Sequence, residues 1–212
     1  MSGPDRFDPE SGGASRHRAT GFRALVEKRP VFTALAFEAG LGIVALVLAV
    51  ILGLRPWQAI DPGSGAAAQS LAATALLVAG VLALMQAQWR WVHNLERIVR
   101  DHLVPLFRDA GPVALGAVSL AAGIGEELLF RGVIQDGIAG PAGPVAGLLI
   151  ASLLFGLAHA ITPAYFVLAS LMGLYLGGIY LATGNLLVPI LVHFLYDWIL
   201  LSRYLARRRA QP

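Results

Sequence analysis

Six apolar runs of about twenty residues each constrain the fold of this 212-residue chain more than any other feature. They cover roughly 33–54, 66–88, 112–134, 143–161, 163–182 and 186–203. A helix needs about 20 apolar residues to cross the hydrocarbon core of a membrane. Pro and Gly motifs such as Asp61-Pro62-Gly63 and Gly140-Pro141 separate the runs. The pattern therefore predicts an all-α fold, a polytopic membrane helical bundle with about six transmembrane helices.

Composition supports the same fold class. The chain is 57% hydrophobic and only 14% charged, whereas a soluble domain is usually about one-quarter charged. It has no cysteine, which excludes a disulfide framework and a thiolate metal site. The formal net charge of +3 comes from basic residues between or beyond the apolar runs. We therefore expect these charges to interact with the lipid bilayer, and we expect no nucleic acid partner.

The distribution of Lys and Arg predicts the orientation. Six lie before the first run, four lie in 89–111 and four lie at 203–209, whereas the first loop has only Arg55. Cytoplasmic segments of membrane proteins carry an excess of Lys and Arg. Six spans with both ends inside place all three basic regions in the cytoplasm. We predict a multi-pass protein of the cell membrane with cytoplasmic N- and C-termini.

The segment 89–109 has a different character from the six runs. Its apolar residues recur at near-helical spacing with charged residues between them, and they are Trp89, Val92, Val99, Leu103 and Leu106. Such a pattern is typical of an amphipathic helix in the membrane interface, here anchored by Trp89 and Trp91. A cytoplasmic extension of the second span is an equally acceptable interpretation.

Two adjacent glutamates, Glu126 and Glu127, interrupt the third apolar run. A charged side chain near the centre of a bilayer costs about 3 kcal/mol or more, so such residues usually have a function. Helix neighbours point about 100° apart, so the two carboxylates face different surroundings. Arg131 is four residues after Glu127 and can pair with it on one helix face. This pairing would leave Glu126 free for another role.

Later runs add three polar residues at helical spacing. His159 follows Phe155 by four residues near the end of the fourth run, and His193 precedes Asp197 by four in the sixth. Ionisable side chains in separate apolar helices need one another for solvation. A rise of 1.5 Å per residue puts all of them within one or two helical turns of mid-membrane. We therefore expect them to line one cavity with the two glutamates.

Two kinds of hydrolytic chemistry fit these residue types. A carboxylate and an imidazole can remove a proton from water while a second histidine donates to the developing oxyanion. Alternatively, Glu126, His159 and His193 are the two-histidine, one-glutamate ligands of a catalytic zinc. The residue types are the same in both cases, and the sequence leaves them open. We favour no cofactor, with zinc as the alternative.

These motifs resemble those of the CPBP family of intramembrane proteases. They are Glu126-Glu127-x-x-x-Arg131, Phe155-x-x-x-His159 and His193-x-x-x-Asp197. The family includes type II CAAX prenyl endopeptidases and bacterial proteins tied to bacteriocin processing and self-immunity. The similarity covers about 88–202 and extends to Thr183-Gly184-Asn185-Leu186 before the third motif.

The resemblance implies a role for each residue. Glu126 and His159 would activate water, Glu127 and Arg131 would hold the site or substrate, with Phe155 as a supporting residue. His193 with residue 197 would stabilise the oxyanion. Many relatives have Asn at this last position, and an ionised Asp197 cannot donate a hydrogen bond. We expect Asp197 to orient His193, or to stay protonated in a low-dielectric site.

Composition, apolar runs and the resemblance together divide the chain. We predict a disordered cytoplasmic tail (1–30), two N-terminal transmembrane helices (31–88), a CPBP-like catalytic membrane domain (89–203) and a basic C-terminal tail (204–212). The expected function is cleavage of a peptide bond in a membrane-anchored peptide or protein. A catalytically idle scaffold for a membrane partner and a small proton-coupled transporter are the rival functions. The sequence does not define the oligomeric state.

Two further features have structural interpretations. Gly173-x-x-x-Gly177 predicts close helix packing inside the bundle rather than dimerisation. Glu38 in the first run is near the membrane interface, and we interpret it as reaching water.

Overall fold

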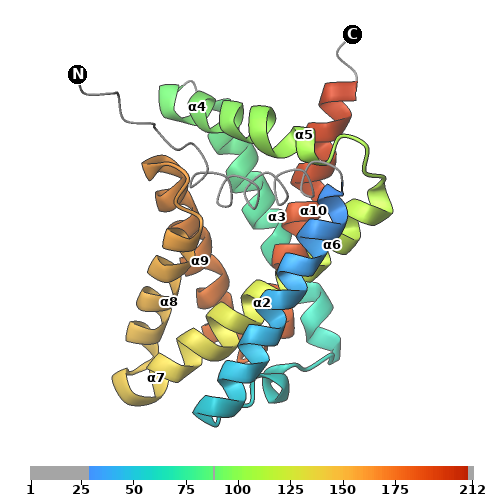
Figure 1. Ribbon diagram of the computed structural model, residues 1–212. Helices are drawn as coiled ribbons and strands as arrows, with labels where there is room; N and C mark the ends of the chain where they lie inside the picture. The colour runs from blue at the N-terminus through green and yellow to red at the C-terminus, as the bar shows by residue number, and fades with distance from the viewer. Residues whose placement is uncertain (1–28, 88, 210–212) are drawn as a thin grey trace, which may run out of the picture.

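The computed structural model describes residues 29–87 and 89–209, and within them all regular structure is helical (Figure 1). The α-helices are α2 (Pro30–Leu52), α3 (Ser64–Gln86), α4 (Arg90–Ile98), α5 (Val104–Leu106), α6 (Pro112–Glu127), α7 (Asp136–Ala142), α8 (Pro144–Ala158), α9 (Pro163–Thr183) and α10 (Leu187–Arg209). A 3-10 turn η2 (Pro56–Ala59) and two π-helical segments, η3 (Val99–Leu103) and η4 (Leu128–Gln135), complete the order. The all-α fold class is confirmed.

Five helices of the described residues are long and apolar enough to cross a membrane, and they are Pro30–Leu52, Gly65–Gln86, Pro112–Ala142, Pro163–Thr183 and Leu187–Arg207. The remaining predicted span, the fourth run at 143–161, is present as α8, an apolar helix of only 15 residues. Large apolar side chains are exposed along these helices, for example Val50 and Leu76. A surface of this kind suits lipid and not water, so the chain is a multi-pass membrane protein.

The third span is longer than predicted. Gly140-Pro141 was expected to break the chain, but α6, η4 and α7 form one continuous helical span of 31 residues, Pro112–Ala142. Pro141 lies in the last turn of α7, and the chain reverses only at Gly143, whose φ is +87°. A glycine takes up this conformation without strain. The predicted break at Gly140-Pro141 is therefore wrong, and the two runs separate at Gly143 instead.

The amphipathic segment forms a helix of its own. Ala87, after α3, has an extended backbone, and α4 then runs across one end of the bundle (Figure 1). The interpretation as an extension of the second span is thus wrong. Val92 and Val104 are buried, whereas Trp89 and Trp91 are exposed. Placement in the membrane interface stays a prediction.

The last helix, α10, continues past the predicted end of its run. Leu205 is buried against Val104, Phe107 and Leu115, which holds the final turns of α10 beside α5 and α6. Residues 204–209 are accordingly helical, although we had expected a tail. The C-terminal end of α10 and the basic helix α4 lie at the same end of the bundle (Figure 1). Two of the basic regions therefore share one face, as the charge distribution predicts; the cellular side of that face stays a prediction.

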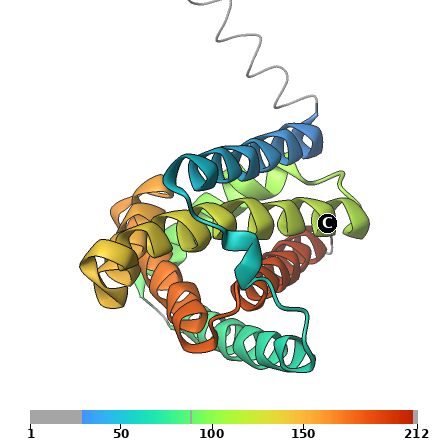
Figure 2. The ribbon, with the colours of Figure 1, turned by 90° about the horizontal axis from the view of Figure 1, so that it is seen from below.

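The N-terminal helix α2 runs alongside α6, as the view from below shows (Figure 2). Their closest approach is at Gly125. A Cβ there would lie 2.5 Å from the Glu38 carbonyl oxygen and 3.4 Å from the Gly42 nitrogen. Only glycine permits two backbones to come this close. The contact places Glu38 of α2 near the two adjacent glutamates of α6, Glu126 and Glu127.

Candidate active site

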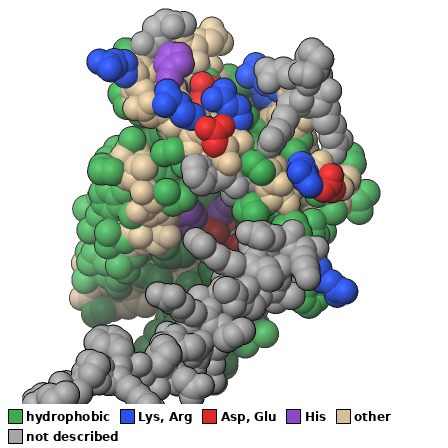
Figure 3. All heavy atoms as spheres, turned by 45° about the horizontal axis from the view of Figure 1, so that its top comes forward, with side chains coloured by type: hydrophobic (Ala, Val, Ile, Leu, Met, Phe, Trp, Pro, Cys, Tyr) green, Lys and Arg blue, Asp and Glu red, His purple; other side chains and the backbone are tan. Residues whose placement is uncertain are grey.

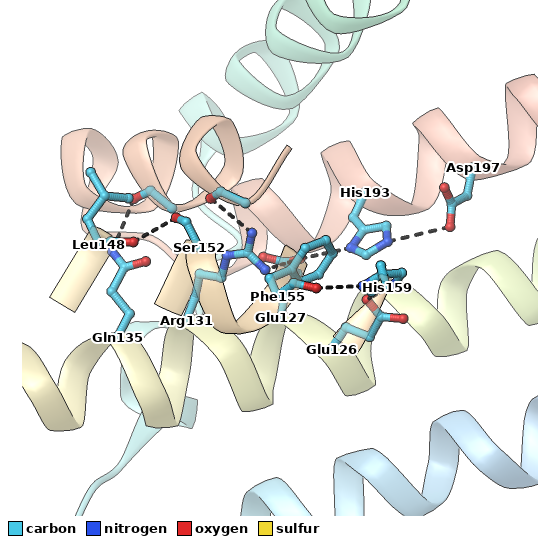
Figure 4. A network of polar contacts seen from close by, with 12 residues as sticks. Glu126, Glu127, Arg131, Gln135, Leu148, Ser152, Phe155, His159, His193 and Asp197 are labelled. Atoms are coloured by element: carbon cyan, nitrogen blue, oxygen red, sulfur yellow. Dashed lines mark hydrogen bonds and ion pairs between the residues drawn. The ribbon is translucent and has the colours of Figure 1, made fainter. Parts of the chain in front are cut away.

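The polar residues singled out in the sequence come together in the interior of the bundle (Figure 4). Glu126 and Glu127 end α6, and Arg131 lies in the π-helical η4. His159 follows the last residue of α8, and the fourth element, α10, carries His193 and Asp197. Residues as far apart in the sequence as Glu126 and Asp197 thus contribute to one cluster.

Glu127 is sealed inside this cluster. Its side chain is 0% exposed, and its Oε1 accepts from Arg131 Nη1 at 3.0 Å and from His193 Nδ1 at 2.8 Å. The predicted Glu127–Arg131 pair is therefore confirmed. A carboxylate held between two donors has the geometry of a structural anchor, and it has little freedom to meet a substrate.

Arg131 is equally enclosed. Its Nη2 donates to the Gly173 carbonyl oxygen at 3.1 Å, and its guanidinium lies 4.7 Å from the centre of the Phe155 ring. A buried charge is tolerated when it is paired and fully hydrogen-bonded. Arg131 has an ion pair with α6, a carbonyl acceptor on α9 and an aromatic ring of α8, so it ties three helices together.

Gln135 repeats this contact one turn further on. The residue is buried, and its Nε2 donates to the Gly177 carbonyl oxygen at 3.1 Å. A Cβ at Gly177 would lie 2.6 Å from Gln135 Oε1. The Gly173-x-x-x-Gly177 face therefore packs within the bundle, as predicted. The sequence analysis missed Gln135, although its spacing of four from Arg131 and eight from Glu127 was a usable signal.

Glu126 has a different environment from its neighbour. It is 8% exposed, and its Oε2 is buried without a hydrogen-bond partner among the described residues. His159 Nε2 lies 3.7 Å from this oxygen. The other nitrogen, Nδ1, is 2.8 Å from the Phe155 carbonyl oxygen, which can only accept. His159 Nδ1 therefore carries a proton, and in the neutral ring the Nε2 lone pair faces Glu126.

His193 connects the sealed part of the cluster with the open part. Its Nδ1 contacts Glu127, and its Nε2 lies 3.4 Å from Asp197 Oδ2. Carboxylates accept hydrogen bonds, so a ring protonated on both nitrogens satisfies both contacts. Asp197 is 37% exposed, so it can exchange this contact for water or substrate. The expected orienting contact from Asp197 is present.

Aromatic packing fixes the two histidines. The Phe155 ring stacks on His159 with centroids 4.5 Å apart and meets His193 edge-on at 6.1 Å. Phe130 packs edge-on against Phe155 at 5.0 Å. Rings in such contact have one preferred orientation. Phe155 therefore serves both as support for the histidines and as the surface under Arg131.

Glu38 and Tyr165 are additional residues of this neighbourhood. Glu38 Oε2 is buried without a hydrogen-bond partner in the described chain, and Glu38 lies within electrostatic reach of Glu126, His193 and Asp197. The interpretation that Glu38 merely reaches water is therefore wrong. Its position depends on the α2–α6 crossing, which a single sequence does not reveal. Tyr165 of α9 lies beside His159, with ring centroids 6.4 Å apart.

The donor set does not fit a bound metal as arranged. Both nitrogens of His193 contact carboxylates, and His159 Nδ1 faces a carbonyl. In the chain that the structure describes, no three His, Asp or Glu side chains are arranged to hold a metal ion. A zinc ligand needs a nitrogen lone pair directed at the ion, and His193 has none to offer. We derive no step through a metal.

The cluster is accessible from the end of the bundle that carries α4. Histidine and acidic side chains are visible at the floor of a hollow in the space-filling view from this side (Figure 3). Basic and acidic side chains lie around its upper rim.

Fold and cluster together define a class, a multi-pass membrane protein with a buried glutamate–histidine centre. Residues 109–199 match the family model described as "Type II CAAX prenyl endopeptidase Rce1-like". The match contains both glutamates, Arg131, both histidines and Asp197. The resemblance that the motifs indicate is thus confirmed: residues 109–199 are similar to the Rce1-like endopeptidases. Helices α2 and α3 lie outside the match.

One curated relative supports the match. The "Uncharacterized protein YpbD" of Bacillus subtilis (strain 168) is 36% identical over 83 residues, which are 38% of this chain. The matched part is 40% of YpbD, so this chain spans less than half of that relative's length. No solved structure matches.

Proposed function

We propose that this protein is an intramembrane endopeptidase that hydrolyses a peptide bond of a membrane-anchored substrate. The observation that carries the proposal is the contrast between two adjacent carboxylates. Glu127 Oε1 accepts from both Arg131 and His193, although its Oε2 has no hydrogen-bond partner among the described residues. Glu126 Oε2 is also buried without such a partner, and it lies 3.7 Å from a histidine nitrogen. A buried carboxylate in this state needs a further polar group, and water is the simplest.

In the proposed reaction a water molecule bridges the two groups. Hydrogen bonds of about 2.8 Å from one water to Glu126 Oε2 and to His159 Nε2 are compatible with a separation of 3.7 Å. Glu126 and His159 together remove a proton as the water oxygen attacks the peptide carbonyl carbon. The C=O electron pair moves onto oxygen. The C–N bond then breaks, the retained proton passes to the leaving amine, and the products are a carboxylate and an amine.

The developing oxyanion needs a hydrogen-bond donor. His193 Nε2–H is the nearest candidate, because its 3.4 Å contact with Asp197 is long and can yield to a stronger acceptor. Asp197 orients the ring before the reaction and does not itself donate. Glu127, through its contact with His193 Nδ1, fixes the same ring from the other side.

Membrane-anchored peptides are the substrate class that suits this site. The cluster lies inside a bundle with an apolar surface, and its opening faces one end. The printed name of the matched family describes prenyl endopeptidases, and we extend to this chain only the cleavage of peptides held at a membrane. The site has no need of a nucleic acid partner.

The test uses purified protein and a panel of membrane-anchored peptides, assayed with and without a chelator. Cleavage that Glu126→Gln abolishes, and that a chelator leaves unchanged, is the expected result. A scaffold or a proton-coupled transporter would cleave none of the peptides. Zinc bound at one per active chain, lost together with activity and restored together with it, would overturn the metal-free chemistry.

The predicted orientation has a separate test. Cysteine introduced at Gly140, at the end opposite α4, should react with a membrane-impermeant reagent in intact cells. Cysteine at Ser15, which lies outside the described residues, should react only after permeabilisation. Labelling with the opposite pattern would contradict the cytoplasmic location of the termini.

A further inference from the structure

The arrangement of His193 and Asp197 leaves the site short of an oxyanion donor. One N–H of His193 is committed to the sealed Glu127, and the other contacts Asp197. An ionised aspartate only accepts hydrogen bonds. Amide-hydrolysing sites normally direct more than one donor at the oxyanion. A second donor must therefore come from another residue of the cluster.

Tyr165 carries a hydrogen-bond donor beside the cluster. Both Glu126 and Asp197 act electrostatically on its hydroxyl. Its ring is tilted across His159, with centroids 6.4 Å apart. Among the described residues nothing forms a hydrogen bond with this hydroxyl, in contrast to Tyr175 and Tyr180, whose hydroxyls donate to Ala73 O and Asp136 Oδ2.

The backbone holds Tyr165 in place. Thr162 caps α9, and its Oγ1 accepts from the Tyr165 N–H at 3.2 Å. Pro163 begins the helix with a fixed φ. His159 precedes this cap by three residues, so one tight connection between α8 and α9 carries both side chains. Such a connection presents the hydroxyl with little loss of conformational entropy on substrate binding.

We propose that the Tyr165 hydroxyl donates a hydrogen bond to the oxyanion formed during peptide hydrolysis and is thus a catalytic residue that replaces the missing donor at position 197. The hydroxyl carries its proton at neutral pH and keeps it throughout the step. The contact forms as negative charge moves onto the carbonyl oxygen. This inference rests on the proposed peptidase function and deepens it.

A double-mutant cycle tests the proposal. In the wild-type background, Tyr165→Phe keeps the ring and should lower kcat about 10²- to 10³-fold with little change in KM, as for the loss of one oxyanion donor. In an Asp197→Asn background the amide supplies a donor of its own, so Tyr165→Phe should cost less than about tenfold. Non-additivity of this kind reports that two groups serve the same atom.

The matched control is Tyr175→Phe, which removes a hydroxyl bonded to α3 and should leave kcat unchanged. Thermal unfolding of each variant shows whether the fold is intact. Unchanged kcat for Tyr165→Phe, equal losses in both backgrounds, or a loss confined to KM would overturn the donor role.

Failure of the proposed function has a different signature. A wild-type protein that cleaves no membrane-anchored peptide overturns the peptidase and the donor role together. Cleavage that depends on Glu126 but not on Tyr165 overturns the donor role alone. Cleavage that depends on both, with non-additivity at Asp197, supports both.

Discussion

The two adjacent glutamates occupy opposite kinds of surroundings. Glu127 has both a guanidinium and an imidazole as donors and is wholly enclosed, whereas Glu126 Oε2 has a histidine nitrogen at 3.7 Å and no hydrogen-bond partner among the described residues. We call Glu127, Arg131, Gln135 and their backbone acceptors the sealed network, and Glu126 with His159 the open pair. A rotation of about 100° on one helix separates a group that holds the fold from a group that can react.

The comparison teaches how a membrane bundle can carry charge. In the sealed network each charge is compensated by another group of the protein. Removing one of these charges should therefore lower the free energy of unfolding. In the open pair the compensation is incomplete, so the pair is ready to bind water, and its loss should be felt in catalysis. The predictions that follow separate these two kinds of effect.

The largest expected effect is on catalysis, at the open pair. Glu126→Gln keeps the size of the side chain but removes its basicity, and kcat should fall about 10³- to 10⁴-fold. The unfolding midpoint in detergent should remain within a few degrees of wild type. Near-normal cleavage by this variant would assign the base to another residue.

The next effect is on stability, at the sealed network. Glu127→Ala leaves Arg131 as an unpaired buried charge, and the free energy of unfolding should fall by about 3–5 kcal/mol. Denaturant titration of the purified protein measures this loss.

Glu127→Gln is the informative control for that variant. It keeps an acceptor oxygen for Arg131, so it should cost less than the alanine. Equal losses for the two would mean that the negative charge of Glu127, and not its side-chain volume or a neutral acceptor oxygen, is what stabilises the fold.

A smaller effect is expected where α2 meets the cluster. Gly125→Ala introduces a Cβ 2.5 Å from the Glu38 carbonyl oxygen, so α2 must shift, at a cost of about 1–3 kcal/mol. Gly40→Ala is the matched control on α2, because a Cβ at Gly40 meets no atom within 4 Å. Equal unfolding midpoints for the two variants would contradict the tight crossing.

The smallest effect is expected at the edge of the open region. Asp197→Asn keeps an oxygen for His193 and adds an amide donor, so activity should stay within about tenfold of wild type. Elemental analysis of the same sample should show less than stoichiometric zinc. Loss of bound metal and of activity together in this variant would instead mark Asp197 as the support of a metal-ligating histidine.

Local spacing predicted much of this. Glu127 and Arg131, four residues apart on a helix, pair as expected, and so do His193 and Asp197. The six apolar helices were predicted in number and approximate position. Periodicity within one segment is local information, and it is sufficient for contacts of this kind.

Contacts between segments that are distant in the sequence could not be predicted from the periodicity of a single segment. The bond from His193 to Glu127 spans 66 positions, and the position of Glu38 depends on how closely α2 approaches Gly125. Pro141 indicated a break at Gly140-Pro141. The helix α7 nevertheless includes Pro141 in its final turn and ends one residue later. The catalytic roles and the domain division stay predictions, since neither packing nor similarity tests them.

The π-helical segment η4 has a consequence for how this protein tolerates changes in length. A π turn takes up one residue more than an α turn, because its hydrogen bonds run from i to i+5. Deleting one residue among 128–130 would let the π turn close into an α turn, so Gln135 would keep its orientation towards the Gly177 carbonyl. The same deletion in the regular helix α6 would turn the residues before it by about 100° relative to Gln135. A scan of single-residue insertions and deletions along α6 and η4 would therefore show which positions fix the helical register, and single substitutions cannot show this.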